Sequence, residues 1–151
     1  MKRIEAITKI YMENENSFFI LSNGLTSREA AHFHPHNGSF YLLHAMGEAL
    51  SVAIGLASTN PKLRIVVIDG DGNALMGMAS WSSNKFKNIK YYILRNGTYD
   101  TTGSQVIPDI PMPPDWCHIY DIQIGQEISP NPPSPDVILK NSINWLNNYT
   151  I

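Results

Sequence analysis

The feature that most constrains the fold is a segment in which a buried strand runs directly into a glycine-rich turn. Residues 63–68 are almost continuously apolar and β-branched, which is typical of a strand buried on both faces of a parallel sheet. The strand ends at Gly70-Asp71-Gly72, where two glycines allow a sharp turn and a close approach of the backbone to a ligand. A helix is predicted from Asn73 to about Phe86, and its first amides would face that ligand and favour an anion.

Further oxygen donors follow the next predicted strand. Residues 91–94 are apolar, and the chain then turns at Asn96-Gly97-Thr98-Tyr99. Because open α/β sheets bind ligands at the carboxyl ends of their strands, Asp71 and Asn96 are expected to meet there. Magnesium prefers a few hard oxygen donors with phosphate oxygens completing its shell. Asp71, Asn96 and the backbone carbonyl of Thr98 therefore predict a magnesium diphosphate site. The alternative is that both motifs are only tight turns.

The two motifs together resemble the thiamin diphosphate motif of the pyruvate-decarboxylase-like enzymes. The chain is more similar still to phosphonopyruvate decarboxylase and to the beta subunit of sulfopyruvate decarboxylase. Four pieces carry this similarity: residues 23–29, 39–41, 45–47, and the block 70–76 with 96–105. The resemblance is faint beyond Gln105. It implies a three-layer α/β/α thiamin diphosphate-binding fold with a mostly parallel sheet, in which Mg²⁺ binds the three ligands named above.

The resemblance also implies which residues contact the cofactor. Met46 would support the bent cofactor, and the carbonyl of His44 would accept a hydrogen bond from its aminopyrimidine amine. Thr26 and Glu29 form a predicted capping box that starts a helix, and the alternative for Thr26 and Ser27 is that they only cap it. For Met46 the alternative is a core position in a predicted buried helix over 45–57. The complete set is Asn23, Thr26, Ser27, His44, Met46, Gly70, Asp71, Gly72, Asn73, Ala74, Asn96, Thr98 and Tyr99.

A glutamate that these enzymes need for activating the cofactor lies in a separate pyrimidine-binding domain. A chain of 151 residues is expected to form one domain, and the glycine-rich turn begins as early as Gly70. Residues 1–151 are therefore expected to be a single diphosphate-side domain, shortened after Gln105. The resemblance then implies that the glutamate comes from a partner subunit in a hetero-oligomer. The catalytic residues of this chain itself stay unknown.

The implied reaction is the nonoxidative decarboxylation of a small 2-oxo acid. The first expectation is conversion of 3-phosphonopyruvate to phosphonoacetaldehyde and CO₂, and the second is a sulfopyruvate decarboxylase subunit of the beta type. A noncatalytic cofactor-binding subunit is the competing hypothesis, because shortening after Gln105 would remove residues that border the substrate.

Two arginines are candidates for binding anions. Arg28 follows the predicted diphosphate loop, and its planar charged group suits a phosphonate or sulfonate. A surface salt bridge is the alternative for Arg28. Arg95 precedes the motif asparagine, and two hypotheses stay open for it: a contact with the diphosphate or an ion pair with Asp69.

Composition argues against several other classes of function. The chain is 43% hydrophobic, enough to build a core, and its net charge of −2 shows no sign of nucleic-acid binding. It has no apolar run long enough to span a membrane. A soluble cytoplasmic subunit with neither a nucleic-acid nor a membrane partner is therefore expected.

The carboxyl third departs from the family. Residues 106–116 are rich in proline and are expected to form no helix. A strand is predicted over 118–124. A last helix is predicted after the Ser134-Pro135 start signal. Its expected buried stripe is Leu139, Ile143 and Leu146.

Overall fold

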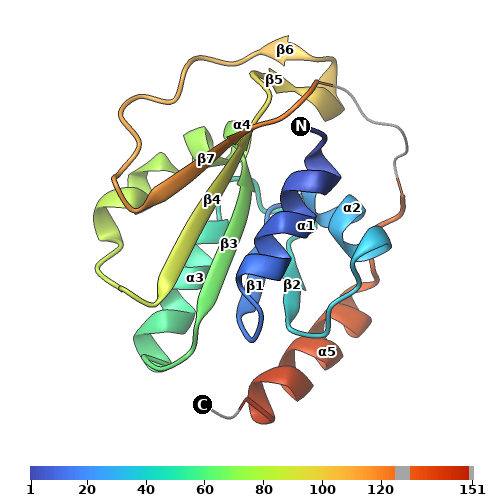
Figure 1. Ribbon diagram of the computed structural model, residues 1–151, viewed down its shortest axis with the longest axis vertical. Coiled ribbons are helices and arrows are strands. Elements are labelled where there is room, and N and C mark those ends of the chain that lie inside the picture. The colour runs from blue at the N-terminus through green and yellow to red at the C-terminus, as the bar shows by residue number, and fades with distance from the viewer. Residues whose placement is uncertain (125–129, 150–151) are drawn as a thin grey trace.

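A computed structural model of the protein describes residues 1–124 and 130–149. The described residues form a five-stranded parallel sheet in the order β2-β1-β3-β4-β7 (Figure 1). Its strands are β1 (Phe18–Leu21), β2 (Ser39–Tyr41), β3 (Ile65–Gly70), β4 (Ile89–Arg95) and β7 (Cys117–Asp121). A separate antiparallel pair, β5 (Thr98–Tyr99) and β6 (Gln105–Val106), follows β4. The predicted α/β class with a parallel sheet is confirmed.

Helices cover both faces of the sheet (Figure 1). They are α1 (Arg3–Glu13), α2 (Leu25–Phe33), α3 (Ala49–Thr59), α4 (Asp71–Met76) and α5 (Pro135–Asn147), with the 3₁₀ helices η1 (Met78–Ser83) and η2 (Asp100–Thr102). Alternate residues of β3 explain the layers: Ile65 and Val67 pack into the core under α3 and η1, whereas Val66 and Ile68 pack under α1 and α2. In the described part of the chain, no helix combines the length and the apolar character that crossing a membrane requires.

The helix after β3 is shorter than predicted. It begins at Asp71 rather than Asn73 and ends at Met76, and the 3₁₀ helix η1 takes over after Gly77. The backbone of Gly47 packs directly against Gly77, so that a Cβ on Gly77 would overlap the carbonyl oxygen of Gly47. This contact between distant segments ends the helix where its sequence would continue it.

The carboxyl third agrees with the sequence in part. Residues 107–116 contain no helix, and α5 begins as predicted, with the Ser134 hydroxyl accepting a hydrogen bond from the Val137 amide at 3.4 Å. The strand β7 is shorter than predicted and ends at Asp121. The predicted stripe of α5 is wrong at two of its three positions, because Leu139 and Ile143 are 56% and 47% exposed, whereas Leu146 is half-buried against the core. The buried residues of the helix are Ile138 and Ser142.

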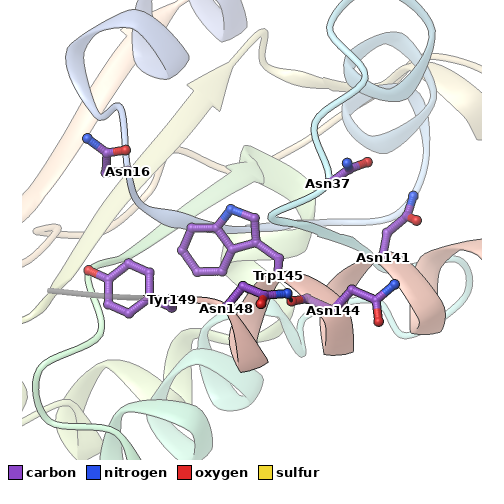
Figure 2. A pocket seen from close by; sticks show the side chains of 7 residues that line it. All are labelled: Asn16, Asn37, Asn141, Asn144, Trp145, Asn148 and Tyr149. Atoms are coloured by element: carbon purple, nitrogen blue, oxygen red, sulfur yellow. Dashed lines mark hydrogen bonds between the residues drawn. The ribbon is translucent and has the colours of Figure 1, made fainter.

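The packing of Trp145 explains this change of face (Figure 2). Its ring centroid lies 5.5 Å from that of Phe18 and 4.8 Å from that of Tyr149. Gly38 makes room for the indole, since a Cβ there would lie 2.6 Å from the ring. The helix therefore turns toward the edge strand β2. A groove of about 480 Å³ beside the indole is lined by Asn16, Asn37, Asn141, Asn144 and Asn148.

Candidate active site

The carboxyl ends of β3 and β4 meet as predicted. The two strands pair in parallel with Gly70 opposite Leu94, which places Asp71 beside the turn that starts at Asn96. A cavity of about 80 Å³ opens at this point. It is lined by most of the predicted cofactor residues: Asn23, Thr26, Met46, Gly70, Asp71, Gly72, Asn73, Asn96, Thr98 and Tyr99. The other predicted residues, Ser27, His44 and Ala74, are not among those that line it.

The carboxylate of Asp71 joins the two turns. The residue is 3% exposed, and its Oδ1 accepts a hydrogen bond from the Gly72 amide at 2.9 Å. Its Oδ2 accepts from the amides of Asn96 at 2.9 Å and Gly97 at 2.7 Å. An ionised carboxylate offers about four acceptor sites, so these three donors leave room for a cation.

Side chains hold the turn after β4 in one conformation. Nδ2 of Asn96 donates to Asp100 Oδ2 at 2.7 Å, and Oδ1 of Asn96 accepts from the Thr98 amide at 3.1 Å. The Thr98 hydroxyl donates to Asp100 Oδ1 at 2.7 Å. The turn also needs the glycine at position 97, whose φ is 76°. Asp100 therefore organises the two proposed ligands that follow β4, a role the sequence did not indicate.

Met46 lies in a loop and not in the predicted helix over 45–57. Since α3 begins only at Ala49, Met46 is 40% exposed and lines the cavity, so the alternative of a buried core methionine is wrong. Oδ1 of Asn73 accepts a hydrogen bond from the Gly47 amide at 3.1 Å and holds this loop beside α4. The carbonyl of His44 accepts from the Met46 amide at 3.2 Å.

The start of α2 differs from the predicted capping box. The helix begins at Leu25 after Gly24, whose φ is 87°, so Thr26 lies inside its first turn and lines the cavity. The Ser27 hydroxyl faces main-chain carbonyls, the nearest being that of Ser22 at 2.6 Å. Glu29, the expected second member of the box, instead binds Arg3 at 2.8 Å. A buried ion pair with Arg3 of α1 thus takes the place of the local cap.

The residues present fit a magnesium diphosphate group. Besides the oxygen donors around Asp71, the buried Oδ1 of Asn23 has no hydrogen-bond partner. Buried polar atoms are nearly always paired, and turning the amide over exchanges its donor and acceptor. Asn23 can therefore donate to a phosphate oxygen in the cavity that it lines.

A second carboxyl lies under the site. Asp69 is 1% exposed, and its Oδ2 accepts a hydrogen bond from the Tyr91 hydroxyl at 3.0 Å. Burial raises the pKa of Asp69 to about 7, although the hydrogen bond from Tyr91 opposes this shift. Asp69 does not line the cavity, whereas Asp71 does, so of these two carboxyl groups Asp71 is the one that a cation can reach.

Neither Arg28 nor Arg95 lines the cavity. Nε of Arg95 donates to Oδ1 of Asp121 at 2.6 Å, so Arg95 pairs with Asp121 rather than with Asp69. That hydrogen bond raises the pKa of Arg95 and lowers that of Asp121. A substrate contact by Arg28 stays a prediction.

Gly77→Ala is expected to lower the free energy of unfolding by about 1–3 kcal/mol, because the new Cβ would overlap a backbone atom of Gly47 that cannot rotate aside. Urea unfolding followed by circular dichroism measures this. Gly55→Ala is the control: nothing lies within 4 Å of its Cβ, and alanine in α3 is expected to stabilise by about 0.5–1 kcal/mol. Equal changes in the two variants would contradict the contact between the loop and α4.

Comparison with known proteins supports a cofactor site at this position. The family model "Thiamine pyrophosphate enzyme, C-terminal TPP binding domain" matches residues 19–115, more than half of the chain. Thiamine pyrophosphate is another name for thiamin diphosphate. The matched span contains the cavity residues contributed by α2, by the loop before α3, and by the turns after β3 and β4.

Individual proteins with similar sequences belong to the same group of decarboxylases. The chain is 40% identical over 108 residues to sulfopyruvate decarboxylase subunit beta from Methanocaldococcus jannaschii, which covers 69% of this chain and 57% of that protein. It is 36% identical over 107 residues to phosphonopyruvate decarboxylase from Streptomyces hygroscopicus, covering 68% of this chain and 26% of that protein. The chain thus spans between about a quarter and three fifths of these relatives.

A solved structure with a similar fold is 2-oxoglutarate:ferredoxin oxidoreductase from Magnetococcus marinus. The match has a TM-score of 0.52 and 25% identity, and covers 69% of this chain and 37% of that one.

Proposed function

The chain belongs to the family of the thiamine pyrophosphate enzyme C-terminal TPP binding domain, and on this premise we propose that it is the cofactor-binding subunit of a nonoxidative 2-oxo acid decarboxylase. One observation carries the proposal. The Asp71 carboxylate lies at the end of β3 and is hydrogen-bonded to the amides of Asn96 and Gly97 at the end of β4, within a cavity that both turns line. This arrangement supports Mg²⁺ held by Asp71, Asn96 and the Thr98 carbonyl.

The chain's own residues bind and orient the cofactor. Asn23, Thr26 and Asn73 lie around the proposed diphosphate position, and Met46 projects from its loop beside them. When bound, thiamin diphosphate supplies the electron sink for loss of CO₂, while the protein supplies orientation and an anion-binding crevice.

The relatives favour a sulfonated substrate. Two sulfopyruvate decarboxylase beta subunits are 40% and 38% identical to the chain, against 36% for a phosphonopyruvate decarboxylase. We therefore place sulfopyruvate first and phosphonopyruvate second. Both are 3-substituted pyruvates with an anionic group, which a similar crevice can accept.

A partner subunit completes the proposed enzyme. Several of the relatives are named as beta subunits, which supports a hetero-oligomer in which a second chain brings the pyrimidine-binding domain and its glutamate. The crossover from β4 to β7 holds only a short hairpin, η2 and an extended segment. If this shortening has removed the substrate side, the chain is a noncatalytic cofactor-binding subunit instead.

Co-expression with the pyrimidine-domain chain, followed by an assay for aldehyde release, tests the proposal. Turnover of sulfopyruvate or phosphonopyruvate by the purified complex is expected. Binding of thiamin diphosphate without turnover of either acid would favour the noncatalytic subunit. Failure of the complex to bind the cofactor would contradict the proposal as a whole.

Arg28→Gln is expected to reduce kcat/KM for the sulfonated or phosphonated substrate by about 10- to 100-fold, since it removes a charge-assisted contact to that anionic group. Pyruvate lacks the group and serves as the control substrate, with a much smaller expected loss. Steady-state assays on both substrates separate the possibilities. Equal losses would assign Arg28 to the cofactor or the fold, and no loss on either would exclude it from the site.

A further inference from the structure

We infer that Arg3, at the start of α1, positions the proposed metal ligands through Asp100. The inference rests on the proposed function and extends it to a helix that no motif of the sequence included. Arg3 also lines the cavity, together with Asp100. In sequence the two residues lie almost a hundred positions apart.

The guanidinium of Arg3 is held between two carboxylates from different elements. Its Nη1 donates to Oε1 of Glu29 in α2 at 2.8 Å, and its Nη2 donates to Oδ2 of Asp100 in η2 at 2.9 Å. The three side chains are 7%, 8% and 9% exposed, in the order Arg3, Glu29 and Asp100. Because these charges are removed from water, solvent screens them little, and their geometry is fixed.

Asp100 connects this anchor to both ligands of the turn. The oxygen that binds Arg3 also accepts from Asn96 Nδ2 at 2.7 Å, and the other oxygen accepts from the Thr98 hydroxyl at 2.7 Å. Since the amide nitrogen of Asn96 is bound to Asp100, its oxygen faces the opposite way and keeps a lone pair for a cation. Outer hydrogen bonds of this kind orient the ligands in metal sites generally.

The positive charge of Arg3 matters because of the negative groups nearby. Asp100 follows the same turn whose amides bind the Asp71 carboxylate, and the proposed ligand adds an anionic diphosphate. The rigid fork of Arg3 pairs with Asp100 and keeps its oxygens directed at Asn96 and Thr98. Without Arg3, Asp100 is expected to turn toward the cation itself, and Asn96 then loses its orientation.

The test uses variants that break opposite sides of the same guanidinium. Asp100→Asn and Arg3→Met disrupt the link to the turn, whereas Glu29→Gln weakens the other pair and leaves Asp100 bound. The full chain, with its copurifying partner, is titrated with Mg²⁺ at fixed thiamin diphosphate by calorimetry. Thermal unfolding without either ligand is measured in parallel.

The Mg²⁺ concentration for half-saturation is expected to rise about 10- to 100-fold in Asp100→Asn and Arg3→Met, and to change by less than about twofold in Glu29→Gln. All three variants are expected to unfold at lower temperature. If Arg3→Met does not fold, Arg3→Lys, which keeps the charge but loses the fork, replaces it with the same expected direction.

Two results would overturn the inference. An equal change in the Mg²⁺ requirement of Glu29→Gln and Asp100→Asn would reduce the network to a structural role, and an unchanged requirement in Asp100→Asn would remove the link to the metal. These two results concern the variants alone. If the wild-type protein itself does not bind thiamin diphosphate at saturating Mg²⁺, the proposed function and this inference are overturned together.

Discussion

Replacing Asp71 with alanine is expected to abolish retention of thiamin diphosphate. Asp71 is the one charged side chain among the three proposed ligands, and at 3% exposure it is screened little by water. Removing one partner of a buried charge pair costs about 3–5 kcal/mol, which corresponds to roughly a 100-fold to several-thousand-fold loss of affinity. Calorimetry with thiamin diphosphate and Mg²⁺ on the assembled protein measures this loss, and circular dichroism checks the fold.

Asp71→Asn distinguishes the loss of metal binding from the loss of the fold. Its amide oxygen can still accept from the Asn96 and Gly97 amides, whereas its NH2 group then faces the Gly72 amide, which loses its acceptor, and the side chain carries no charge for a cation. We expect this variant to keep the fold with some loss of stability and to bind the cofactor poorly. Asp121→Ala, at an exposed carboxylate paired with Arg95, is the control and should bind normally. Unchanged affinity in both Asp71 variants would refute the metal assignment.

The isolated chain is expected to show no decarboxylase turnover. We propose that the glutamate that activates the cofactor lies in a pyrimidine-binding domain on a partner subunit, so that this chain alone lacks it. Turnover should appear when the partner is added, and it should vanish again when the partner's glutamate is changed to glutamine. Steady activity from rigorously purified single chains, with no copurifying protein by mass spectrometry, would refute the requirement for a partner.

Binding of the partner subunit is expected to depend on exposed methionines at and beside the cavity. Met46, Met76 and Met78 are 40%, 54% and 39% exposed, and the Gly47–Gly77 contact brings their segments together. Met46→Lys should weaken binding of the partner about tenfold or more, because it places a charge in an apolar contact. Met12→Lys is the matched control at a site 71% exposed on α1. Sedimentation velocity measures both, and equal behaviour would place the partner elsewhere.

Local sequence patterns predicted the parts of the fold that depend on local forces. The apolar run before Gly70 required a strand buried on both faces, and the parallel register then brought Asp71 to the turn at Asn96. The Ser134-Pro135 start of α5 was predicted for the same reason, since a cap involves only residues a few positions apart.

Where the prediction failed, a contact from a distant segment had replaced the local preference. Glu29 was expected to cap its own helix but binds Arg3, and the helix after β3 stops where the backbone of Gly47 meets Gly77. The buried face of α5 follows from the position of Trp145 over Gly38 rather than from its apolar stripe.

The sequence by itself therefore determined the sheet, its ligand-binding edge and the oxygen donors at Asp71 and Asn96. Only the tertiary structure decided that Met46 faces the cavity, and that Arg3 and Asp100 hold the turn that carries Asn96 and Thr98. Strand periodicity and turn chemistry act over a few residues and are visible in the sequence. An ion pair between residues almost a hundred positions apart forms only after the sheet has brought its partners together.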